Sequence, residues 1–192
     1  AGIPLHTLEA YLRVLVAKGH RVAVAEQMAL PSECKGIVPR EVTRIVTAGT
    51  ILDTQSLDDK DHNYLVCLVF GKNARVGFSA ADVGTGDFYG CEFALDNIEQ
   101  ISEEVLRFQP SELIYVEQVA DSKISDLIEK LKAQMRTLSL VPRIFSASNE
   151  ICEEMLKREF KLGSLAGLGL SEYKQGIAAL ACMLDYIKRI AM

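Results

Sequence analysis

Residues 63–93 constrain the fold of this 192-residue chain more than any other stretch. Tyr64–Phe70 is an unbroken apolar run followed by Gly71, which is typical of a strand that is covered on both faces and ends in a tight turn. Two more strand-like runs follow, at residues 75–81 and from Asp87 onward. Three sequential strands with short turns predict an antiparallel meander, and its apolar faces require helices to cover them.

The turn between the second and third strands reads Asp82-Val83-Gly84-Thr85-Gly86. Its glycines permit backbone angles that other residues resist, and we expect Asp82 to cap the amides of Gly84 and Thr85. We therefore assign a structural turn role to Asp82, Gly84, Thr85 and Gly86. A phosphate-binding role is not expected, because a strand rather than a helix N-terminus follows the glycines.

Downstream of the meander, helical and strand-like patterns alternate, which implies parallel strands with right-handed crossovers. This element order predicts an α/β fold of the ribonuclease H-like type. We expect helices at residues 98–108, after Asp121 to about 131, 148–160 and 176–191, and strands at residues 113–116 and 137–141.

The first fifty residues predict one amphipathic helix from Pro4 to Gly19 and two short strands, at residues 21–27 and 41–50. So few elements do not make a domain, and the chain starts without methionine, so we expect that upstream sequence has been removed. The polar, acidic residues 49–61 indicate a boundary. We predict a first unit at residues 1–52, a linker at residues 53–62, and a second unit from residue 63 onward.

Composition narrows the class of protein. No apolar run approaches 18 residues and no signal-like leader is present, so we expect no membrane span and a cytoplasmic location. The five cysteines are scattered and never form a C-x-x-C pair, which disfavours a disulfide framework or a zinc site.

Charge is divided unevenly along the chain. Residues 1–50 carry six basic and four acidic side chains, which gives a local charge of +2. The net charge of the whole chain is −5, so the remaining residues carry −7. If any part contacts a polyanion, the first fifty residues are the candidates, although an ordinary solvated surface explains a charge this small.

A ribonuclease H-like fold raises the alternative of a metal-dependent nuclease, which needs several converging carboxylates. The first strand contains no acid, and the nearby Asp82, Asp87 and Glu92 lie on the second and third strands. Residues 163–169 are rich in glycine but lack the lysine of a nucleotide-binding loop. We therefore expect no catalytic residue, metal ligand or cofactor site, and keep the nuclease and a protein-interaction module without a DNA role as alternatives.

Four ordered segments of the chain resemble signature segments of the MutS family of DNA mismatch-recognition proteins. They cover nearly the whole chain, which makes the resemblance far more specific than any single motif. The segments are AGIPLHTLEAYLRVLVAKGHRVAVAEQ (residues 1–27), KGIVPREVTRIVTAGT (35–50), ADVGTGDF (81–88) and SLAGLGLSEYKQGIAALACMLDYIK (164–188).

The resemblance implies that residues 1–52 are the rear of the mismatch-binding domain, residues 63–172 the ribonuclease H-like connector domain, and residues 173–192 the start of the lever domain. It implies DNA, the repair partner MutL and the other MutS domains as partners, with homodimers formed by the full-length family. The family's Phe-x-Glu mismatch reader and its ATPase are not in this stretch, so it should not be an enzyme, and ATP and Mg belong to the full-length family.

Carried over to this sequence, the resemblance implies contact with the DNA backbone near the start of the chain. His6 would contact phosphate or sugar without base readout. Lys35, Arg40 and Arg44 are further candidates, with a solvated surface as their alternative. The full set of expected DNA-backbone contacts is Gly2, Ile3, Pro4, Leu5, His6, Lys35, Arg40 and Arg44.

Overall fold

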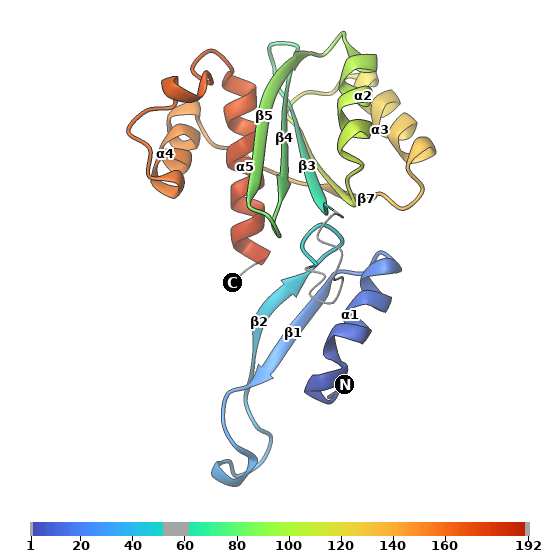
Figure 1. Ribbon diagram of the computed structural model, residues 1–192, viewed down its shortest axis with the longest axis vertical. Helices are drawn as coiled ribbons and strands as arrows, with labels where there is room; N and C mark the ends of the chain where they lie inside the picture. Colours follow the sequence, from blue (N-terminus) through green and yellow to red (C-terminus); the bar gives the residue numbers. More distant parts are fainter. Residues whose placement is uncertain (1, 52–61, 191–192) are drawn as a thin grey trace.

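The computed structural model describes residues 2–51 and 62–190, which form two units of unequal size (Figure 1). The first unit is a slender extension from one end of the second. Except for His62, the predicted linker at residues 53–62 lies outside the described residues. No helix in the described ranges is long and apolar enough to cross a bilayer.

The first unit packs one helix on a two-stranded antiparallel sheet. Leu12 and Val16 lie one turn apart on its helix and are buried against Val24 and Val46 of the strands. The apolar face of the helix and the apolar face of the strands therefore form one small core. Its elements are the short 3-10 helix η1 (Leu5–Thr7), α1 (Leu8–Ala17), β1 (Val22–Gln27), the 3-10 turn η2 (Pro31–Glu33) and β2 (Arg40–Val46).

The second unit is built on a five-stranded sheet with the order β5-β4-β3-β6-β7. β3, β4 and β5 pair antiparallel, which confirms the predicted meander, and β6 and β7 run parallel to β3, as the strand–helix alternation predicted. The strands are β3 (Tyr64–Phe70), β4 (Arg75–Asp82), β5 (Asp87–Ala94), β6 (Glu112–Glu117) and β7 (Ser139–Pro142).

Helices cover both faces of this sheet (Figure 1). The α2 and α3 helices pack on the face that carries Val66, Leu68 and Phe70, while α5, with α4 outside it, packs on the opposite face of β3. Residues 65–70 are completely buried, which confirms that the apolar run is covered on both sides. The helices are α2 (Ile98–Phe108), α3 (Ser122–Gln134), α4 (Asn149–Phe160) and α5 (Lys174–Ile190), with the 3-10 turn η3 (Ala166–Leu168) before α5.

The α5 helix is an integral part of the second unit's core. A Cβ atom on Gly77 of β4 would lie 1.8 Å from the carbonyl oxygen of Gln175, so only glycine lets helix and strand approach this closely. The Ser79 hydroxyl also donates a hydrogen bond to the carbonyl of Ala179, at 3.0 Å. The resemblance assigned residues 173–192 to the start of the lever domain, whereas α5 here covers one face of the second unit's sheet.

Candidate functional site

The two units meet at a tight turn of residues 47–51, whose backbone is held by side chains of the second unit. Asn63 donates its side-chain amide to the carbonyls of Ala48 and Ile51, at 3.0 and 3.1 Å. The Ser111 hydroxyl lies 3.0 Å from the same Ala48 carbonyl. Buried backbone polar groups need partners, so these bonds make the turn part of the second unit's surface rather than a loose tether.

Glu112, the first residue of β6, is the central side chain of this junction. It is completely buried, and one carboxyl oxygen accepts a hydrogen bond from the Gly49 amide at 2.9 Å. The other oxygen accepts a hydrogen bond from the Tyr186 hydroxyl of α5. A carboxyl group in this position is stable only while both oxygens are satisfied, so the first unit, β6 and α5 depend on the same side chain.

Tyr186 is buried between cations of both units. The Arg21 guanidinium of the first unit lies 5.8 Å from its ring centroid, and that of Arg143 lies at 5.2 Å, within reach of cation–π attraction. Arg143 also pairs with Asp185 of α5. Burial raises the pKa of Tyr186 well above its ordinary value, and the charge of Glu112 adds to the shift, so its hydroxyl remains a donor at physiological pH.

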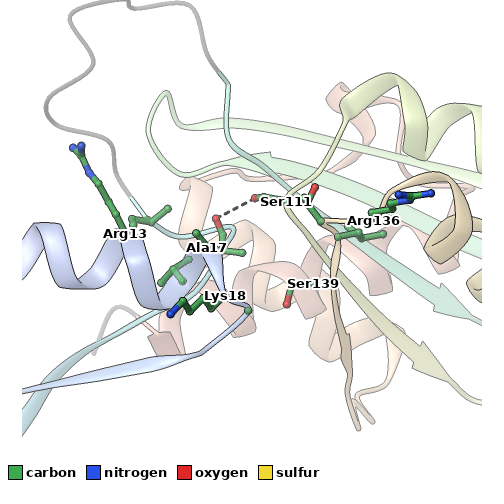
Figure 2. A pocket seen from close by; sticks show the side chains of 12 residues that line it. Arg13, Ala17, Lys18, Ser111, Arg136 and Ser139 are labelled. Carbon is green, nitrogen blue, oxygen red and sulfur yellow. Dashed lines mark hydrogen bonds between the residues drawn. The ribbon is translucent and has the colours of Figure 1, made fainter.

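A cavity of about 630 Å³ opens at this junction, between the end of α1 and the starts of β6 and β7 (Figure 2). The described residues of its wall include Arg13, Lys18 and Arg136 and no acidic side chain. The buried side-chain atoms that lack a partner among the described residues are Arg143 Nε and Gln175 Oε1, and neither residue lines it. Among the described residues, no unpartnered buried polar side chain points to a ligand in this cavity.

The expected DNA-backbone residues all belong to the first unit. Residues 2–6 precede α1 and are exposed, and Lys35 is exposed in the loop between β1 and β2. Arg40 begins β2, and its guanidinium donates to the Val38 carbonyl at 3.4 Å. Arg44 pairs with Glu9 of α1 at 2.8 Å, so one of the expected cations is already neutralised by its own unit.

The turn residues come together as a hydrogen-bonded group. The Asp82 carboxylate accepts from the amides of Gly84 and Thr85, at 2.8 and 3.4 Å, and lies 2.9 Å from His62 Nδ1. Burial acts to raise the pKa of Asp82, but the bonds from His62 and the turn amides outweigh it and lower that pKa. Gly86 has φ +81°, in the left-handed region that favours glycine.

The carboxylates considered for a nuclease are engaged in structural contacts. Asp87 accepts from the Thr85 hydroxyl at 2.9 Å. Glu92 pairs with Arg75 at 3.0 Å and accepts from the Gln175 amide at 2.7 Å, at the start of α5. Within residues 2–51 and 62–190, no group of three or more His, Cys, Asp or Glu side chains is arranged to hold a metal ion.

Sequence reasoning missed Glu112 and Tyr186. The one available signal was a carboxylate at the very start of an apolar strand, Glu112-Leu113-Ile114, where an acid must find a buried partner. Nothing local pointed to the partners, which lie 63 and 74 residues away along the chain.

Comparison with known protein families finds a matching domain for each of the two units. The sequence profile of MutS domain I matches residues 1–55, and that of MutS domain II matches residues 63–192. The chain belongs to the MutS family. The resemblance seen in the sequence is thereby confirmed, and the fold is mixed α/β, as predicted.

Curated MutS relatives support the same family across nearly the full chain. The DNA mismatch repair protein MutS of Lachnoclostridium phytofermentans is 38% identical over 97% of this chain, and that of Halothermothrix orenii is 34% identical over 98%. The chain spans about a fifth of the length of these relatives, 19% and 20% respectively. Among solved structures, T. thermophilus RuvC in complex with a Holliday junction substrate matches at 12% identity and a TM-score of 0.43, and the match covers 68% of this chain and 98% of that chain.

Proposed function

We propose that this part of a MutS protein contacts the DNA backbone through its first unit. We further propose that its second unit transmits changes in the orientation of the first unit to the rest of the protein. The observation that carries the proposal is the junction, where Asn63, Ser111 and Glu112 of the second unit hold the turn that leaves the first. A relay between domains needs such a fixed connection, since a flexible linker would dissipate any displacement.

The proposed role of the second unit is that of a ribonuclease H-like connector without catalysis. Its strand order and the parallel pairing of β6 with β3 and of β7 with β6 support this assignment. We further propose that ATP and Mg are bound elsewhere in the full-length protein, that homodimers form through other domains, and that the protein acts in the cytoplasm.

The proposed DNA contacts are the exposed residues at the start of α1, including His6, together with Lys35 and Arg40 near the far end of the two-stranded sheet. Phosphate contacts of this kind fix position without reading sequence. Arg44 is a poorer contact, because its pairing with Glu9 would have to be broken first.

Titration of a fluorescent DNA duplex with the chain at several salt concentrations tests this role. We expect weak binding that is equal for matched and mismatched duplexes and that disappears in moderate salt. The Lys35→Ala and Arg40→Ala variants should each reduce the salt slope by about one. The control is Lys132→Ala, on α3, where the lysine is paired with Glu129 at 2.7 Å. Mismatch-selective binding, or salt-independent binding, would contradict the proposal.

We also propose that the acid-rich second unit offers a docking surface for MutL. Complementary charge favours a protein partner over DNA for this unit. Titrating MutL into the labelled chain, and following fluorescence anisotropy, should give saturable binding that persists in variants lacking Lys35. Absence of saturable binding would remove MutL docking from the proposed function and leave the DNA contacts unaffected.

A further inference from the structure

The junction between the units is close-packed around Gly49. A Cβ atom at this position would lie 2.2 Å from Cδ2 of Leu65 and 3.1 Å from Cβ of Glu112, so the turn leaving the first unit lies directly on the sheet. Ile45 of β2 also packs against the cluster that contains α5. The first unit therefore touches both the sheet and the last helix.

The carboxyl group of Glu112 links these contacts. Of the interactions that the structure assigns to Glu112, one comes from the first unit, through the Gly49 amide, and one from α5, through Tyr186. If the first unit moves away, a completely buried oxygen loses its donor, and an unsatisfied buried acceptor is unfavourable. The carboxyl group must then turn or gain water, and either change disturbs its bond to Tyr186.

Tyr186 is affected by the first unit in a second way. Arg21, just before β1, lies over its ring, so moving the first unit also removes a cation from that ring. The second contact, from Arg143, belongs to the second unit and would remain. Displacement of the first unit therefore changes both the hydroxyl and the ring of one residue on α5.

We propose that Glu112 is a positioning residue that holds the first unit in one orientation and couples that orientation to α5. This inference rests on the proposed function of interdomain signalling and names the residue through which the signal passes. Because one side chain serves both neighbours, the two contacts form and break together, which is what a coupled joint requires.

The distance between the units tests the proposal directly. Spin labels at Ala10→Cys on α1 and Ser125→Cys on α3, both exposed positions, report it by double electron–electron resonance in a Cys34→Ser, Cys91→Ser background. We expect one narrow distance distribution for the otherwise unmodified chain. Glu112→Leu should broaden it at least twofold, and Glu112→Gln and Tyr186→Phe should broaden it less.

The matched control is Glu117→Leu, which replaces the same residue type at the exposed far end of the same strand. It should leave the distribution unchanged. Circular dichroism checks folding, and if Glu112→Leu fails to fold, the isosteric Glu112→Gln and Tyr186→Phe variants decide the question. An unchanged width in the folded variants would overturn the proposal.

Amide hydrogen exchange measures the coupling between the first unit and α5. Leu12→Ala, which loosens the first unit, should accelerate amide exchange at residues 184–190 about tenfold in the unmodified chain. In the Tyr186→Phe background, which lacks the bond between α5 and Glu112, this additional effect should shrink to less than twofold. Equal acceleration in both backgrounds would contradict the coupling. Because DNA binding is measured separately, its failure would count against the proposed function without altering these readouts.

Discussion

The two units bury very different amounts of apolar surface. Among the described residues, the core of the first unit has four buried apolar side chains, whereas the second unit has clusters of nineteen and fifteen on the two faces of its sheet. Large apolar side chains such as Leu5 and Ile37 are 80% and 90% exposed in the first unit. A two-stranded sheet with one helix is only marginally stable alone, so the first unit depends on its junction with the second.

The largest effect is expected where the second unit is packed most tightly. Gly77→Ala places a methyl group 1.8 Å from the Gln175 carbonyl, so β4 or α5 must shift, and the free energy of unfolding should fall by about 3 kcal/mol or more. Urea denaturation measures the loss. Gly163→Ala is the control, because a Cβ there meets nothing within 4 Å, and it should leave the free energy of unfolding unchanged. A stable Gly77→Ala chain would mean that α5 is not tightly packed.

A cavity in the first unit should have a large effect that, outside this unit, reaches only the end of α5. Leu12→Ala removes a 1%-exposed side chain from a four-residue core and should cost that unit about 2–5 kcal/mol. Amide exchange should rise throughout α1, β1 and β2, while β3 and β4 stay protected. The counterpart Leu127→Ala, in the second unit, should instead lower protection across the whole sheet. Equal loss of protection in β3 after Leu12→Ala would show that the units unfold together.

The Asp82 turn should make a moderate, pH-dependent contribution within the second unit. Because the folded state lowers the Asp82 pKa, its stabilisation is present above the ordinary aspartate value of about 3.9 and is lost as pH falls through the lower folded value. Asp82→Asn should cost about 1–3 kcal/mol at pH 7. Urea midpoints of both chains between pH 2 and 7 should converge at the acid end. A difference that stays constant with pH would exclude the carboxylate as its source.

The smallest effect is expected for the ion pair on the surface of the first unit. Arg44 and Glu9 are 44% and 41% exposed, so solvent screens them, and Glu9→Gln should change stability by about 0.2–1 kcal/mol. A double-mutant cycle with Arg44→Gln, in low and high salt, isolates the pair. Glu9→Gln should also release Arg44, so DNA binding should strengthen slightly if Arg44 reaches phosphate. A coupling above about 2 kcal/mol would contradict the surface description.

The helices and strands of the second unit were predictable because each has its own local sequence pattern. The apolar run at residues 64–70, the turn at Asp82 and the helix caps at Asp121 and Ser148 depend on neighbours within a few residues. Strand β7 begins at Ser139, two residues later than predicted, and α5 begins at Lys174, two residues earlier. Such ends depend on packing partners that a local pattern does not contain.

The candidate site was far less predictable than the fold. Glu112 and Tyr186 had no local motif, and their importance comes from hydrogen bonds that span 63 and 74 residues. The family resemblance placed α5 at the start of another domain, and a strongly apolar helix does not by itself say which surface it covers. Its glycine-mediated approach to β4 is visible only in three dimensions.

The sequence by itself determined the element order, the meander, the crossover pairing and the MutS family, because these follow from short-range periodicity and from matching segments in order. Only the tertiary structure decided that the two units share a buried carboxyl group and that the last helix belongs to the sheet it covers. The physical reason is that burial of a polar group is set by everything packed around it, and those neighbours come from distant parts of the chain.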